Sequence, residues 1–279
     1  MAGATMKDIK LRIRSVQSTR QITSAMQLVA SSKLRRARQR MEDTRPYMVA
    51  AREVIADIAA HRDVISPFFR RQESTARCVV VIAGDRGLAG HYNAAVFGIA
   101  DQLIEPDTLV LPIGKKAVDR YRRRGAKLLS DQFIRAEHVT SYQCREAAAS
   151  LIEGFLAGNF GTVTMVGTRF ATALTQDAFA TELLPVTPDE KAEDPHSQLI
   201  MEPAPAELLK AVMPDYLAGC LYGAVCDAVA CEMASRRNAM DSATKNADQM
   251  INDLSLSYNR ARQSSITQEI TEIVAGAEQ

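Results

Sequence analysis

The N-terminal stretch of this 279-residue chain contains almost no helix-breaking residues, and this feature limits the fold most. No glycine occurs between Gly3 and Gly84, and only two prolines, Pro46 and Pro67, lie between them. Apolar residues recur there every three or four positions, as along one side of a helix: Ile9, Ile13 and Val16; Ile22, Met26 and Val29; Leu34, Ala37 and Met41. We predict a helix from about residue 5 to about residue 60, bent or interrupted near Pro46.

The C-terminal segment has the same features as the N-terminal segment. Neither Gly nor Pro occurs between Gly223 and Gly276. Apolar residues step alternately by three and four, the seam of a coiled coil: Met240, Ala243, Ala247, Met250 and Leu254. This pattern predicts a helix from about residue 206 to about residue 275. Because neither long helix can bury its apolar stripe alone, we expect the two to pair antiparallel, with the intervening chain inserted at one end.

The middle of the chain alternates between two kinds of segment. Short apolar runs predict strands, and longer stretches between them predict helices. The strands are expected at 78–83, 107–113, 161–166 and 180–186, and the helices at 93–103, 115–124 and 143–157. This order indicates βαβ units and a mostly parallel sheet. A proline-rich surface loop with a short extended piece, "SQLIMEP", precedes the last helix.

The predicted fold class is therefore α/β plus long α. An antiparallel coiled coil of the N- and C-terminal helices carries an inserted Rossmann-like α/β domain. The terminal helices are assigned to residues 1–62 and 206–279, and the α/β domain to residues 75–200.

The sequence "GDRGLAGHYN", residues 84–93, lies between a predicted strand and a predicted helix. Phosphates bind at such places in α/β folds. Its glycine spacing matches neither the dinucleotide nor the P-loop pattern, and Asp85 stands where a phosphate would lie. Tight turns without a ligand explain the glycines equally. "GKKAVDRYRRRG", residues 114–125, lacks the first P-loop glycine, because position 109 is Leu109, and is interpreted as an exposed basic helix.

Other catalytic signals are absent from the sequence. The four histidines are scattered without metal-ligand spacing, and no Ser, Cys or His lies in a recognisable nucleophile context. The five cysteines form no C-x-x-C pair and are expected to be reduced thiols. We therefore predict a chain that is not itself an enzyme and that carries no metal and no cofactor.

Charge is distributed unevenly along the chain. Residues 1–45 contain eleven Lys or Arg and three acids, a net charge of +8, although the whole chain is +1. A basic face within them includes Lys33, Arg35, Arg36, Arg38 and Arg40. An acidic protein partner fits this face, as does a solvated helix surface. Nucleic acid is the alternative partner, but no aromatic residue for base stacking occurs before Tyr47.

The final helix contains a stretch, residues 259–273, that is polar on every face around its middle. An antiparallel partner beginning near residue 5 leaves this stretch uncovered. Terminal fraying is one explanation, but Ile266, Ile270 and Ile273 keep helical spacing. A projecting helix with mixed faces predicts a binding site in another protein. No apolar run approaches the ~20 residues of a membrane span, and the N-terminus has no signal-peptide core.

The N-terminal segment reads "IRSVQSTRQITSAMQLVASSKLRRARQRM" and the C-terminal segment reads "NADQMINDLSLSYNRARQSSITQEITEIVAG". Both segments resemble the two ends of gamma subunits of F-type ATP synthases. In the middle of the chain, "GDRGLAGHYN", "GKKAVDRYRRRG" and "FATALTQ" resemble the central domain of that family. The resemblance implies a noncatalytic central-stalk rotor that couples ion flow through a membrane c ring to ATP synthesis or hydrolysis. The implied partners are the alpha and beta subunits, the epsilon subunit and the c ring, with no nucleic acid. Membrane association is then through partners only, at the cytoplasmic face of a bacterial cell membrane.

The resemblance also carries roles onto particular residues. Met26 matches a family position that faces the beta subunit, and further positions match the polar contact region for a beta-subunit loop: Arg262, Gln263, Thr267, Glu269 and Glu272. Arg237 departs from the family pattern, which has Met there, and leaves the packing of its turn open. Whether H⁺ or Na⁺ is the coupling ion does not follow from the sequence.

Overall fold

The computed structural model describes residues 6–60, 65–187 and 202–277. Two very long helices, α1 (Met6–Ala60) and α5 (Pro205–Ala277), enclose the rest of the chain in sequence. Among the described residues between them, there are five strands and three further helices. In chain order these are β1 (Arg77–Ile82), α2 (Tyr92–Leu103), β2 (Leu109–Ile113), α3 (Lys115–Arg123), β3 (Lys127–Leu128), α4 (Ser141–Leu156), β4 (Thr162–Phe170) and β5 (Gln176–Leu184), with the short 3-10 turns η1 (Pro67–Phe69) and η2 (Ala136–His138).

The strands form one sheet in the order β3-β2-β1-β4-β5. All neighbours pair in parallel except β5, which runs antiparallel to β4. The predicted fold class is confirmed: a mostly parallel α/β sheet accompanies two long terminal helices. The prediction missed β3, because two residues are too short to leave a pattern in the sequence.

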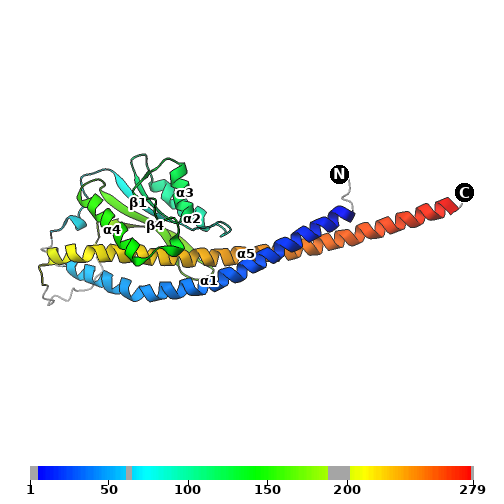
Figure 1. The fold of residues 1–279 in the computed structure, drawn as a ribbon, viewed down its shortest axis with the longest axis horizontal. Coiled ribbons are helices and arrows are strands. Elements are labelled where there is room, and N and C mark those ends of the chain that lie inside the picture. The colour runs from blue at the N-terminus through cyan, green and yellow to red at the C-terminus, as the bar shows by residue number, and fades with distance from the viewer. Residues whose placement is uncertain (1–5, 61–64, 188–201, 278–279) are drawn as a thin grey trace. The chain divides into compact units, whose positions relative to one another are not determined.

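Side chains of β1 alternate between two cores, as a sheet covered on both faces requires. Val79 and Val81 face a core built with α2 and α3. Val80 and Ile82 face a second core, built with α4, the first half of α5 and the end of α1. Figure 1 shows α5 passing along this second face of the sheet. The long helices are therefore structural layers of the α/β domain as well as a helix pair.

The sequence predicted a bend or an interruption near Pro46; the interruption is wrong, since α1 runs through Pro46 without a break. A proline inside a helix removes one backbone hydrogen bond and crowds the preceding turn. Packing offsets that cost here, because Met41 precedes the proline and Ile55 and Ile58 follow it, and all three are buried.

By their packing, the residues divide into two compact units. The sheet unit comprises Ser32–Ser235, and the helix-pair unit comprises Met1–Ser31 with Arg236–Gln279. The boundaries predicted from the sequence follow secondary structure instead, and they assign both long helices wholly to the coiled coil. The difference arises because residues 32–60 and 205–235 bury their apolar stripes against the sheet.

Within the helix-pair unit the two helices run antiparallel. Partner numbers on α5 fall as those on α1 rise: Arg20 pairs with Asp248, Thr23 accepts a 2.8 Å hydrogen bond from Thr244, and Gln27 donates a 2.9 Å bond to Asp241. The sequence predicted this direction. The same register places Met6, where the described part of α1 begins, opposite Arg262.

The seam itself differs from the predicted one. Ile22 and Val29 were expected to face the partner helix, yet they are 58% and 59% exposed. Thr23 and Ala30 are buried instead. On α5, Met240 and Ala247 are buried as predicted, but Met250 is exposed and Ile251 is half-buried. The seam uses small and hydroxyl-bearing residues, so apolar periodicity alone selected the wrong side of α1.

One stretch of α5 passes the length and apolarity test for a membrane span, with an 18-residue window of mean hydropathy 1.4. The sequence analysis predicted no apolar run close to the length of a membrane span, and for this stretch of α5 that prediction is wrong. However, 83% of that window lies buried in the fold. Packing against the sheet therefore accounts for its apolarity, as in the core helix of many globular domains.

Enlarging the buried alanine of the seam tests the close helix pair. We expect Ala247→Leu to lower the free energy of unfolding by ~1–3 kcal/mol, because added methylene groups force the two backbones apart. Thermal unfolding of the full chain, followed by circular dichroism, measures the change. The matched control is Asn246→Leu at the neighbouring exposed position, which should leave the melting temperature nearly unchanged. Equal melting curves for Ala247→Leu and the unmodified chain would contradict the pairing.

Candidate functional site

The loop after β1 closes on side chains of this chain rather than on an open anion site. The backbone amide of Gly84 donates a 2.9 Å hydrogen bond to Asn93 Oδ1. The next two amides, of Asp85 and Arg86, each donate a 3.1 Å bond to the carboxylate of Glu232 on α5. A Cβ at Gly84 would lie 2.9 Å from Glu232 Cδ, so a larger residue would force the Glu232 carboxylate to move from its present position.

Glu232 therefore stands where a phosphate would bind in a nucleotide-binding loop. Its side chain is 2% exposed, and its carboxylate already accepts from the amides that a phosphate would need. The geometry favours the tight-turn interpretation of the glycines over a nucleotide site. Sequence reasoning missed Glu232; the available signal was that Glu232 is one of only two acids, with Asp227, in the otherwise apolar run from Gly223 to Ala234.

Asp85 links this loop to the neighbouring loop after β2. Its carboxylate accepts hydrogen bonds from the amides of Ala136 (2.8 Å), Glu137 (3.1 Å) and Lys115 (3.3 Å). These amides open η2 and α3, where unpaired N–H groups favour an anion. Asp85 is thus a capping residue for two elements.

The predicted basic face divides into two groups in the structure. Lys33 Nζ contacts both carboxylate oxygens of Glu137, at 2.7 and 2.9 Å, and this contact, the largest cause, lowers the pKa of Glu137. Arg40 donates to the carbonyls of Glu137 (3.3 Å) and Val139 (2.6 Å) and to Tyr222 Oη (2.9 Å). Both cations are therefore engaged within the chain.

The other members of the predicted basic face are exposed. Arg38 pairs at 2.9 Å with Glu42 on the same helix, and Arg35 and Arg36 point to solvent. Contact between this face and an acidic partner stays a prediction. Arg35 and Arg36 are the residues of the face that are most available for such a contact.

The structure places the predicted partner-contact residues of both helices in the helix-pair unit. Met26 is half-buried on α1. The predicted contacts on α5 are all exposed: Arg262, Gln263, Thr267, Glu269 and Glu272. Their hydrogen bonds are local to α5, such as Gln268 to Glu272 at 2.9 Å. Arg237 is exposed as well, so its departure from the family pattern does not disturb buried packing.

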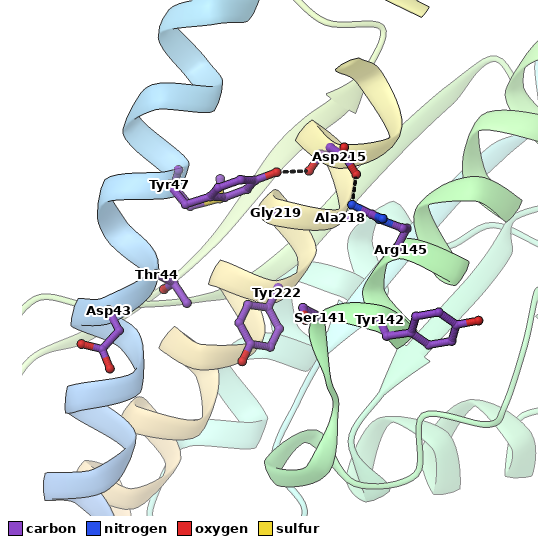
Figure 2. A pocket seen from close by; sticks show the side chains of 11 residues that line it. Asp43, Thr44, Tyr47, Ser141, Tyr142, Arg145, Asp215, Ala218, Gly219 and Tyr222 are labelled. Carbon is purple, nitrogen blue, oxygen red and sulfur yellow. Dashed lines mark hydrogen bonds and ion pairs between the residues drawn. The ribbon is translucent and has the colours of Figure 1, made fainter. Parts of the chain in front are cut away.

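A hollow of about 470 Å³ lies in the sheet unit where α1, α4 and α5 meet. Figure 2 shows the Tyr47 hydroxyl directed at the Asp215 carbonyl, 3.2 Å away, and Arg145 directed at the Asp215 carboxylate, 2.5 Å away. The described lining contains no histidine and no cysteine. Its only acid–base contact is this Arg145–Asp215 ion pair, so the hollow offers no nucleophile and base in contact.

The described residues contain neither a reactive thiol nor a cluster of metal-binding side chains. All five cysteines are buried, and burial raises the pKa of Cys78, Cys144 and Cys231 to about 12. Such thiols stay protonated and unreactive at neutral pH. Within residues 6–60, 65–187 and 202–277, no group of three His, Cys, Asp or Glu side chains could hold a metal ion.

Comparison with known proteins decides the family. The family model described as ATP synthase matches residues 5–279. The ATP synthase gamma chain of Ruminococcus albus is 43% identical over 276 residues, which cover 97% of this chain and 96% of that protein. The sodium-ion-specific ATP synthase gamma chain of Acetobacterium woodii is 37% identical, with 98% of both chains covered. The chain belongs to the ATP synthase gamma chain family.

A solved structure shares the fold. The rotor of the Euglena gracilis mitochondrial ATP synthase superposes with a TM-score of 0.63 at 16% identity, covering 94% of this chain and 98% of that one. As a gamma chain, the protein is a noncatalytic stalk subunit of ATP synthase, with catalysis elsewhere in the complex, as the sequence predicted. It is a peripheral component of a membrane-associated complex. No comparison supports the nucleic-acid alternative.

A groove of about 430 Å³ in the sheet unit holds a half-buried acid, Asp227. Burial raises its pKa to about 6, although Arg45 and Arg169 in the same groove oppose the shift. An acid whose pKa is raised on folding is destabilising when ionised. The penalty is absent below the unfolded pKa near 3.8, grows as the pH rises, and is complete above about 6.

Neutralising this acid should therefore stabilise the chain at high pH. We expect Asp227→Asn to raise the free energy of unfolding at pH 8 by about 1–2 kcal/mol, after allowance for solvent screening. The gain should shrink at pH 5, where Asp227 in the unmodified chain is mostly protonated. Denaturant unfolding at both pH values measures it, with Asp253→Asn at an exposed position as the control. A gain that is equal at pH 5 and pH 8 would contradict the assignment.

Proposed function

We propose that this gamma chain is the rotor shaft of a bacterial F-type ATP synthase, coupling ion flow through a membrane c ring to ATP synthesis or hydrolysis in a ring of alpha and beta subunits. Its proposed partners are those two subunits, the epsilon subunit and the c ring. In support, solved structures that share the fold are described as the rotor, the central stalk with c ring, and the F1 with c ring of ATP synthases.

The observation that carries the proposal is the uncovered end of α5. In the register of the helix pair, the described part of α1 begins opposite Arg262. Beyond that point Ile266, Ile270 and Ile273 are 48%, 56% and 71% exposed. Apolar residues at helical spacing, left exposed over about two turns, favour insertion into a partner. The alpha and beta ring is the partner that the family supplies.

The polar contacts of that end are proposed to be made with the beta subunit. Arg262, Gln263, Thr267, Glu269 and Glu272 are exposed and make no buried contacts of their own among the described residues. Met26 on α1 is proposed to face the beta subunit as well. The exposed Arg35 and Arg36 then complement acidic loops of that subunit, which steers binding through charge.

The location proposed for the chain is the cytoplasmic face of the bacterial cell membrane. Relatives with high coverage come from bacteria, including Ruminococcus albus and Acetobacterium woodii. The most apolar stretch of α5 is largely buried in the fold. Membrane association is therefore proposed to occur through partner subunits and not through this chain.

Native mass spectrometry of a tagged copy, purified from its own cells, tests the assembly. We expect one complex that holds a single copy of this chain with three copies each of two heavier subunits, together with bound adenine nucleotide. Recovery of the chain alone, or with nucleic acid, would contradict the proposal.

A charge at Met26 tests the proposed beta-subunit contact. We expect Met26→Lys to reduce the number of ions pumped per ATP hydrolysed, because a lysine at a half-buried rotor position adds an unpaired charge. Ion pumping, assayed for both H⁺ and Na⁺, and ATP hydrolysis are measured on the same membrane vesicles. Met26→Leu conserves size and polarity and should behave like the unmodified enzyme. A pumping ratio for Met26→Lys equal to that of Met26→Leu would remove Met26 from the interface.

A further inference from the structure

Three polar links in the sheet unit join the two long helices to the loops at the carboxyl end of the sheet. The first runs from α5 to the loop after β1, where the carboxylate of Glu232 accepts from the amides of Asp85 and Arg86 at 3.1 Å. Asp85 extends it to the loop after β2 through its 2.8 Å and 3.1 Å bonds with the amides of Ala136 and Glu137.

The second link runs from that second loop to α1. Glu137 and Lys33 form a two-point ion pair, with Nζ to oxygen distances of 2.7 and 2.9 Å. The third link joins α1 to both the same loop and α5. Arg40 donates to the carbonyls of Glu137 and Val139 and to the hydroxyl of Tyr222, and its guanidinium lies 5.0 Å from the centre of the Tyr222 ring.

These contacts close a ring: from α5 to the first loop, to the second loop, to α1, and back to α5. We propose that this ring is a torsional clamp, in which Glu232, Asp85, Glu137, Lys33 and Arg40 fix both helices against rotation relative to the sheet. The inference rests on the proposed rotor function, since only a chain that carries torque needs such a clamp. The five side chains act as positioning residues and touch no substrate.

The apolar core beside the clamp holds the helices to the sheet, and the polar links add directional contacts to that packing. Leu34, Met41 and Ala230 belong to an apolar cluster at the same level, but apolar contact is non-directional and depends mainly on buried area. Charge-assisted hydrogen bonds are short and directional, so they resist turning.

The clamp also explains two features that the family assignment leaves open. The loop with phosphate-site character keeps its glycine because Gly84 must lie against the Glu232 carboxylate. The basic face of α1 contains two cations, Lys33 and Arg40, that bind groups of this chain. Both features are accounted for by attachment of the helices to the sheet.

The angular spread of a probe on the sheet unit tests the clamp. The alpha and beta ring assembled with this chain is fixed to a surface, and a bead is attached at Leu174→Cys, whose parent leucine is 82% exposed. The variance of the bead angle is recorded while the ring is paused. Angular variance scales inversely with stiffness, so if the three links carried the whole load equally, losing one would raise the variance about 1.5-fold; the share carried by the apolar core makes the expected rise smaller.

We expect Lys33→Glu and Glu137→Lys each to raise the variance, because each places like charges together. Combining the two substitutions restores an opposite-charge pair and should return the variance toward that of the unmodified chain. The pair is about one-third exposed on both sides, so its loss costs little folding stability. Glu42→Gln is the control, since among the described residues Glu42 pairs only along α1, with Arg38.

The outcomes separate the clamp from the rotor proposal. Increased variance in both single variants, with rescue in the double variant and no change in Glu42→Gln, supports the clamp. Variance equal to that of Glu42→Gln in assembled, ATP-hydrolysing complexes overturns the clamp and leaves the rotor proposal intact. Failure of the unmodified chain to assemble with an alpha and beta ring would count against the rotor proposal itself.

Discussion

The structure depends on one constraint: neither long helix can bury its own apolar stripe. An isolated helix gains little stability from propensity and needs a packing surface. The chain meets this need in two ways along the same two helices. Residues 32–60 and 205–235 pack on the sheet, whereas the remaining parts pack on each other through Thr23, Ala30, Met240 and Ala247. The C-terminal end of α5 packs neither on the sheet nor on α1, so its apolar residues stay exposed.

The α/β domain shows how a nucleotide-type sheet can serve a mechanical purpose. In such sheets the loops at the carboxyl ends of the strands are where ligands bind. Here the amides of Asp85 and Arg86 at that edge bind Glu232 instead. The edge of the sheet that binds a ligand in nucleotide-binding proteins is attached here to helix α5. Function therefore follows from what the loop binds and not from the fold.

Much of this architecture could be predicted from the sequence, and the failures have physical causes. Long helices and apolar strands leave strong periodic patterns, so α1, α5 and four strands were found. The seam on α1 was misplaced because Thr23 and Ala30 carry little hydrophobic signal, while the more apolar Ile22 and Val29 remain exposed, available to a partner. Long-range polar contacts such as Lys33 with Glu137, 104 residues apart, leave no local pattern at all.

The central claim is that the α/β domain turns with the helices as part of a rotor. The most direct measurement fixes the alpha and beta ring to a surface, attaches a probe to the sheet unit and follows it by single-molecule microscopy as ATP is added. The account predicts unidirectional rotation of the probe that stops when ATP is withdrawn. ATP hydrolysis at an unchanged rate with a stationary probe would contradict it.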